Sequence, residues 1–123
     1  MHAAPAAFTT YHATLSADQE NPKGPAGGTG TAKIEADAAT GQVCSTLTWS
    51  PQVGTPSAAH IHQGPAGTEG PIVIVLQAAP GRNCVPAAAP VVQGMESNPG
   101  GYYVNIHTNA SPDGAVRGQL SGG

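Results

Sequence analysis

Two histidines that flank a single apolar residue, His60-Ile61-His62, carry the strongest chemical signal in the sequence. Side chains two residues apart on a β-strand point to the same face, about 7 Å apart. Two imidazoles that lean toward a shared point can therefore each reach a metal ion at roughly 2 Å. A third ligand must come from a neighbouring strand, for which His107 is the natural candidate, and His12 is the candidate for a fourth. The pattern predicts a metal site built from histidines.

The two cysteines, Cys44 and Cys84, are too far apart in the sequence for a CxxC motif, which argues against zinc-ribbon and thioredoxin-like proteins. We expect them to form one structural disulfide. Closing a loop of about 40 residues would contribute roughly 3–4 kcal/mol in the chain-entropy model. Such a bond implies an oxidising compartment, so the protein is predicted to be periplasmic or secreted. The alternative is a cytosolic protein with two buried free thiols.

The histidines narrow the choice of metal. Neutral imidazole suits zinc, copper, iron and nickel, and in an oxidising compartment the Irving–Williams order favours copper(II), with zinc as the runner-up. Ring nitrogens that hold no metal should donate to backbone carbonyls or to a carboxylate, and Asp113 and Glu20 are the carboxylates we expect there. Arg117 is expected to form an ion pair with one of these two carboxylates. The alternative is that histidines alternate with an isoleucine on a solvated face by chance.

The elements that would position these residues are strands. Runs of β-forming residues between Gly and Pro clusters predict strands at 8–16, 29–37, 42–50, 58–63, 71–77, 101–108 and 114–120. Thr40-Gly41 supplies a tight turn between the second and third. Residues 78–99 read as a loop that holds either a short helix or a β arch. We therefore predict an all-β, antiparallel Greek-key sandwich or barrel of about seven or eight strands.

Alternation along these strands predicts which side chains face the core. Ile61 and Ile106 are expected to point inward, which places His60, His62 and His107 on the outer face. Further inward-facing residues are expected to be Tyr11, Ala13, Leu15, Val43, Leu47, Trp49, Tyr102 and Val104, while His12, Tyr103 and Asn105 point outward. The proposed metal ligands would thus lie outside the core.

Composition supports one folded domain with few charges. The chain has 123 residues, 4 Lys and Arg against 7 Asp and Glu, and 17 Gly and 12 Pro. That length is typical of a single domain, predicted here over residues 8–123, and residues 1–7 are expected to be a disordered remnant near a signal-peptide cleavage site. The scattered basic residues argue against nucleic-acid binding. No apolar stretch is long enough to span a membrane.

Several segments resemble those of chordin-type (CHRD) domains in order and spacing. They are LSADQENP at 15–22, GTGTA at 28–32, AHIHQG at 59–64, GYYVNIHT at 101–108 and PDGAVRGQL at 112–120. CHRD domains occur in bacterial exported proteins and in chordin, an extracellular antagonist that binds morphogenetic proteins. The resemblance implies an exported domain and, more weakly, an interaction role.

A fainter resemblance is to Cu/Zn superoxide dismutases. In that family one strand carries two copper-binding histidines at HxH spacing and a later strand ends in a third, an order that His60, His62 and His107 match. Asp113 loosely matches an acidic residue that follows. The chain lacks the bridging histidine, the zinc-loop ligands and the substrate-guiding arginine of that family. The resemblance implies a copper site on a superoxide-dismutase-like fold and leaves dismutase activity open.

Three functions follow as hypotheses. The first is an exported copper-binding protein for metal storage, delivery or resistance, with a copper donor or acceptor protein as a partner. The second is a copper-dependent redox enzyme, which needs an open coordination position. The third is an extracellular interaction module in which the histidines bind no metal. The number of protein ligands at the site distinguishes the first from the second.

Overall fold

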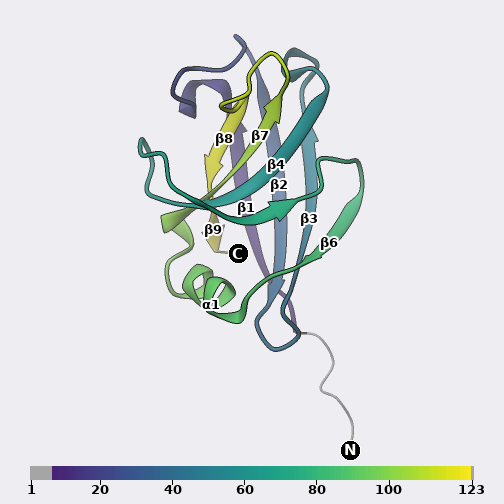
Figure 1. Ribbon diagram of the computed structural model, residues 1–123, viewed down its shortest axis with the longest axis vertical. Coiled ribbons are helices and arrows are strands. Elements are labelled where there is room, and N and C mark those ends of the chain that lie inside the picture. The colour runs from purple at the N-terminus through teal and green to yellow at the C-terminus, as the bar shows by residue number, and fades with distance from the viewer. Residues whose placement is uncertain (1–6, 123) are drawn as a thin grey trace, which may run out of the picture.

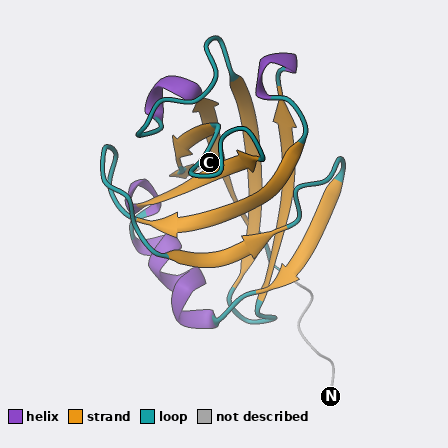
Figure 2. Ribbon diagram, turned by 45° about the horizontal axis from the view of Figure 1, so that its top comes forward, coloured by secondary structure: helices purple, strands orange, loops and turns teal. Residues whose placement is uncertain are grey.

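The computed structural model describes residues 7–122, which form one antiparallel β-barrel that is nearly closed. Its strands are β1 (Thr9–Ser16), β2 (Thr29–Asp37), β3 (Gln42–Trp49), β4 (Pro56–Gln63), β5 (Ile72–Leu76), β6 (Arg82–Pro86), β7 (Tyr102–Thr108), β8 (Val116–Gln119) and β9 (Ser121–Gly122). The helical segments are α1 (Ala89–Ser97) and the short 3-10 turns η1 (Ala17–Gln19), η2 (Pro51–Val53) and η3 (Pro99–Gly101). Figure 2 shows these helical segments at the periphery of the strands.

The strand order is β5-β4-β7-β8-β1-β2-β3-β6, and β9 pairs with β1. Three neighbouring pairs, β4–β7, β8–β1 and β3–β6, are not consecutive in the chain, as in Greek-key connections. β5 and β6, at the two ends of this order, contact one another across the remaining opening. The predicted all-β antiparallel fold is confirmed.

The seven predicted strands agree with β1–β5, β7 and β8 to within two residues at each end. The turn predicted at Thr40-Gly41 is present, and Gly41 has a φ of 65°, which a residue without a Cβ adopts at no steric cost. It joins β2 to β3 in a hairpin that is paired from Gly30↔Trp49 to Asp37↔Gln42.

The core lies inside the barrel and follows the predicted alternation. Ile34, Val43, Ile61, Val104 and Ile106 are fully buried. Trp49 is only half-buried and packs against this core from its edge. Because these side chains come from β2, β3, β4 and β7, which lie on different sides of the barrel, their burial holds the sheet closed.

Residues 78–99, for which a helix or a β arch was left open, form a strand followed by a helix. β6 pairs with β3, with Cys84 opposite Cys44. The helix α1 begins with a proline in its first turn, where a missing N–H breaks no helical hydrogen bond. Val92 and Met95 of α1 are fully buried, so the helix contributes to the core. β9 is a further short strand that the sequence analysis did not predict.

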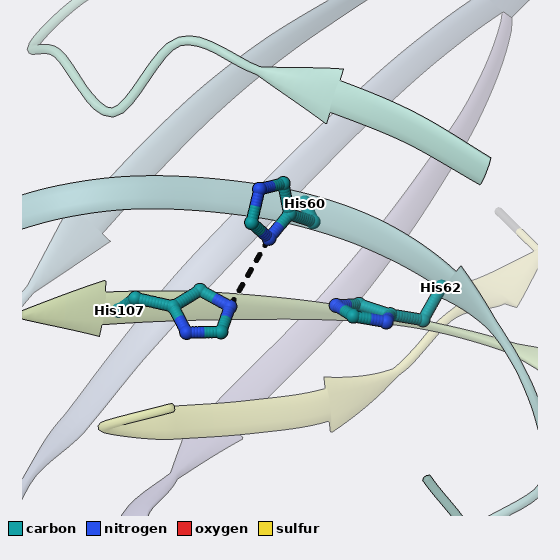
Figure 3. A group of neighbouring side chains, drawn as sticks. All are labelled: His60, His62 and His107. Carbon is teal, nitrogen blue, oxygen red and sulfur yellow. Dashed lines mark hydrogen bonds between the residues drawn. The ribbon is translucent and has the colours of Figure 1, made fainter. Parts of the chain in front are cut away.

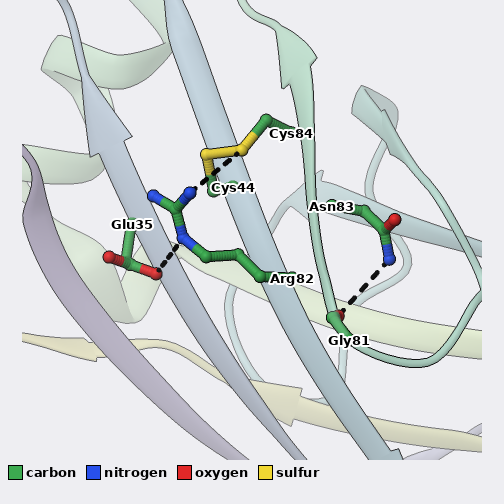
Figure 4. Close-up of polar contacts among 6 residues, drawn as sticks. All are labelled: Glu35, Cys44, Gly81, Arg82, Asn83 and Cys84. Carbon is green, nitrogen blue, oxygen red and sulfur yellow. Dashed lines mark hydrogen bonds and ion pairs between the residues drawn. A yellow bond between two sulfur atoms is a disulfide. The ribbon is translucent and has the colours of Figure 1, made fainter.

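The predicted disulfide is confirmed and joins β3 to the edge strand β6 (Figure 4). Cys44 and Cys84 are 40 residues apart in the sequence, and neither cysteine is free. On the same strand as Cys84, Nε of Arg82 donates to Glu35 on β2 at 2.9 Å. The edge strand is thereby attached to the barrel by a covalent bond and by an ion pair.

Two other predictions concern the ends and the membrane. The disordered segment predicted at 1–7 lies outside the described residues except for Ala7, whose amide donates to Asp37 at 3.1 Å. Among residues 7–122, the helices are too short and too polar to span a membrane.

Candidate metal centre

Three histidines gather on the outer face of the β4–β7 pair. In the register of these strands His60 lies opposite Asn105, His62 opposite Tyr103, and Ala58 opposite His107. The three histidines therefore occupy neighbouring positions on one face of the sheet. One ring nitrogen from each lies within 4.8 Å of those of the other two (Figure 3).

The core anchors this group as predicted, because Ile61 and Ile106 are fully buried on the inner face of the same strands. The outer face, however, is not solvated. His62 is only 8% exposed, Asn105 3% and Tyr103 2%. The His62 ring stacks on the Tyr103 ring, with centroids 4.7 Å apart. The alternative of a chance pair on a solvated face is therefore wrong for His62.

Hydrogen bonds at the back of two rings determine which nitrogens face the centre. Nδ1 of His62 donates to the Gly70 carbonyl oxygen at 2.9 Å, and Nδ1 of His107 donates to the Pro112 carbonyl oxygen at 2.9 Å. A carbonyl oxygen only accepts, so each Nδ1 carries the hydrogen and the neutral ring has its lone pair on Nε2. Both Nε2 atoms are thus available as metal ligands.

The two Nε2 atoms, of His62 and His107, both face the side-chain oxygen of Asn105. Oδ1 of Asn105 lies 2.9 Å from Nε2 of His62 and 3.0 Å from Nε2 of His107. Nδ1 of His60 lies 3.1 Å from the same Nε2 of His107 and, without a metal, is the donor of this hydrogen bond, because Nε2 of His107 has only a lone pair. The Asn105 oxygen, in contrast, faces two acceptors, and their repulsion is relieved either by a cation between them or by an amide turned to present its NH2 group. The chemistry of the donor set fits a metal ion.

His60 is held in its neutral form. Burial, together with the neighbouring His107 and His62 rings, lowers its pKa from 6.5 to about 4. An imidazole that is neutral at neutral pH offers a lone pair without first losing a proton.

A cavity of about 370 Å³ adjoins the histidines. Its wall contains His62, His107 and Asn105, together with the charged residues Glu20, Glu69, Asp113 and Arg117. Two of the three candidate ligands therefore line this cavity, whereas His60 does not line it and is half-buried. This cavity could not be predicted from the sequence, because its wall comes from separate segments of the chain.

Glu20 is buried against this cavity without a full set of partners. The residue is 7% exposed, and its Oε2 atom has no hydrogen-bond partner among residues 7–122. Burial raises the pKa of Glu20 to about 7, although the nearby Arg117 acts in the opposite direction. Gly114 packs directly on the Glu20 carboxylate, so a Cβ at that position would overlap it.

Arg117 does not form the predicted ion pair. Within residues 7–122 the one salt bridge joins Arg82 to Glu35. The Arg117 guanidinium instead donates to the carbonyl oxygens of Thr68 at 2.8 Å and Pro65 at 2.9 Å. It also donates to Gln119 at 3.0 Å and lies 3.4 Å above the Tyr103 ring. Its role is to attach the loop at 64–71 to the barrel.

The remaining predicted site residues are placed as follows. His12 lies exposed on β1, opposite Lys33 and Ser121, and does not join the group of three histidines. Asp113 and Glu20 line the cavity, but the ring N–H groups of the histidines donate to backbone carbonyls instead of to these carboxylates. Asn105 faces outward beside His107, as predicted. Its contacts with His62 and His107 were not predicted.

These features define an all-β antiparallel barrel with a partly buried group of three histidines on its outer face. The chain belongs to the CHRD domain family, whose model matches residues 11–120. No curated protein and no solved structure matches it. Family membership and the disulfide are together consistent with an extracellular module.

Proposed function

We propose that the chain is an exported copper-binding protein that holds the ion at His60, His62 and His107 and exchanges it with a partner. The observation that carries the proposal is the convergence of three ring nitrogens within 4.8 Å. Two of these rings are fixed from behind by backbone carbonyls, an arrangement typical of metal-binding histidines.

The spacing of the donors supports a first-row transition metal. Two ligands at about 2.05 Å from one ion lie about 2.9 Å apart at a right angle and about 3.4 Å apart at the tetrahedral angle. Nδ1 of His60 and Nε2 of His107, at 3.1 Å, fall in this interval. The limit of 4.8 Å exceeds these spacings, so binding would draw the rings together by up to about 0.7 Å for opposite ligands and up to about 1.4 Å at the tetrahedral angle.

Copper is the proposed ion because all three donors are imidazoles. Such a site follows the Irving–Williams order, in which copper(II) binds more tightly than zinc, nickel or iron(II). The disulfide supports a compartment where copper(II) persists, either the periplasm or the cell exterior. Zinc is the second choice, since it accepts the same nitrogen ligands.

The cavity favours a second candidate as well. Three histidines with an open side toward a cavity leave a coordination position for an exogenous ligand, as a copper-dependent redox enzyme requires. Exchange with a partner protein needs the same open side, because an incoming ligand must reach the ion. Assays of copper-loaded and metal-free protein for superoxide dismutation and for oxygen activation distinguish the two functions.

The proposal is tested by titrating metal-free protein with copper(II) against a chromophoric chelator. We expect His60→Ala and His107→Ala each to weaken copper binding by more than the roughly 100-fold typical of changes behind a ligand. His12→Ala is the matched control, because it removes an imidazole outside the group, and it should bind as wild type does. His62→Ala should also lower the stability of the metal-free fold, since this ring is buried against Tyr103.

Equal copper affinity in the wild type and in a His60/His62/His107 triple alanine variant would refute the metal site. In that case the third hypothesis, an interaction module without metal, would take its place. A loss of affinity in His12→Ala equal to that in His60→Ala would contradict the ligand set proposed here. Electron paramagnetic resonance of the copper-loaded protein adds an independent readout of nitrogen coordination.

A further inference from the structure

The cavity beside the histidines has charged groups from four separate segments of the chain. Glu20 follows η1, Glu69 lies in the loop at 64–71, Asp113 precedes β8, and Arg117 is on β8. Glu69 and Asp113 are exposed, whereas Glu20 and Arg117 are buried. The cavity therefore has two carboxylates at its solvent side and a third on its inner wall.

The single cation on this wall is already held by the chain. The Arg117 guanidinium makes three hydrogen bonds to oxygen atoms of the chain and lies flat over Tyr103. Because the exposed Glu69 and Asp113 outnumber this one guanidinium, the solvent side of the cavity favours positive ions. An anion that approaches His62 and His107 through this cavity must pass Glu69 and Asp113.

Glu20 supplies a separate observation that points to a cation. Its Oε2 atom is a buried acceptor on the cavity wall without a hydrogen-bond partner among the residues described. Gly114, with a φ of 125°, leaves the space that this carboxylate occupies. Buried acceptors are ordinarily paired, so an unpaired one that faces a cavity marks a place where a donor or a cation fits.

We propose that this cavity is the path by which a metal cation enters and leaves the histidine group, with Glu69 and Asp113 at its mouth and Glu20 on its inner wall. This inference rests on the proposed function and adds the route and the charge of the ligand. It predicts opposite effects of the mouth carboxylates on two probes. They speed the arrival of a cation, and they weaken the binding of an anion to the loaded metal.

The test measures the rate at which aqueous copper(II) binds metal-free protein by stopped flow at pH 6.5 and low ionic strength. A Glu69→Gln/Asp113→Asn variant should bind copper about 10-fold more slowly, at the lower end of the range that electrostatic steering produces. The difference should shrink at 0.15 M salt, where exposed charges are screened beyond about 8 Å. Both side chains are exposed, so the substitutions should leave the fold intact.

The matched control is Glu96→Gln, which removes an exposed carboxylate from α1 at the opposite end of the barrel (Figure 1). It should change the rate by less than 2-fold. In copper-loaded protein, azide should bind several-fold more tightly to the Glu69→Gln/Asp113→Asn variant than to wild type.

Two results would overturn the inference while leaving the proposed function in place. One is a double variant that binds copper as fast as Glu96→Gln with the same salt dependence, and the other is weaker azide binding to that variant. If the His60/His62/His107 triple alanine variant binds copper as wild type does, both proposals are overturned.

Discussion

Replacing Glu20 by glutamine should stabilise the metal-free protein at alkaline pH and leave it unchanged at acid pH. Burial raises the pKa of Glu20 from 4.5 to about 7 in the folded protein. Between these values the folded state holds a proton that the unfolded state has lost, so the free energy of unfolding falls as the pH rises through this interval. Below about pH 4.5 both states are protonated, and the carboxyl group then contributes no pH dependence.

The size of the effect follows from the same values. A pKa that rises from 4.5 to about 7 corresponds to at most about 3.5 kcal/mol, at about 1.4 kcal/mol for each pH unit. Because Glu20 lines a cavity, solvent screening reduces this figure, and we expect a destabilisation of about 1 to 2 kcal/mol above pH 7. Glutamine has nearly the same shape as the protonated carboxyl and also carries a donor, so the variant should avoid this loss.

The assay is urea denaturation of metal-free wild type and Glu20→Gln from pH 4.5 to 8.5. Subtracting the two curves removes the contributions of all groups that the proteins share. We expect agreement near pH 4.5 and a variant that is more stable by about 1 to 2 kcal/mol at pH 8. Parallel curves over the whole range, or a variant less stable at pH 8, would refute the assignment of a buried and nearly unpaired carboxyl. Glu96→Gln serves as the control for the loss of one negative charge.

Two further predictions concern the parts that hold the barrel and its outer face together. Replacing both Cys44 and Cys84 by serine should lower the free energy of unfolding by about 3 to 4 kcal/mol, because the disulfide joins residues 40 positions apart. Denaturant unfolding measures this loss, and an unchanged midpoint would contradict it. Arg117→Gln should lower the free energy of unfolding by about 2 to 4 kcal/mol, since it breaks charged hydrogen bonds to Thr68 and Pro65. It should also speed amide hydrogen exchange at residues 64–71 more than elsewhere. Equal exchange in both proteins would show that other contacts hold the loop.

The strands and the inner face could be predicted because they depend on local patterns. Ile61 between two histidines determines the face of each by alternation alone, and Ile106 does the same for His107. The tight turn at Gly41 is likewise encoded in neighbouring residues. Such short-range patterns determine local structure independently of which strands later pair.

The pairing of strands and the cover over the outer face could not be predicted in this way. β4 and β7 are separated in the chain by β5, β6, α1 and η3, and only the closed barrel brings His107 beside His60. The strand β6 is short and ends at Pro86, so it lacks the alternation that reveals a strand. The hydrogen bonds of Arg117 run to backbone carbonyls, which every residue possesses and no sequence motif marks.

The proposed metal site would account for the polar layer on the outer face of β4, β7 and β8. His62, Asn105 and Arg117 are all buried there, on a face that apolar side chains could cover without unpaired acceptors. The unpaired Oε2 of Glu20 reduces the stability of the metal-free fold. A cation in the cavity would offset this cost, and a cation at the histidines would draw the lone pairs of three rings onto one ion. The free energy of copper binding should therefore appear directly as added stability, by the linkage that couples any ligand of the folded state to unfolding.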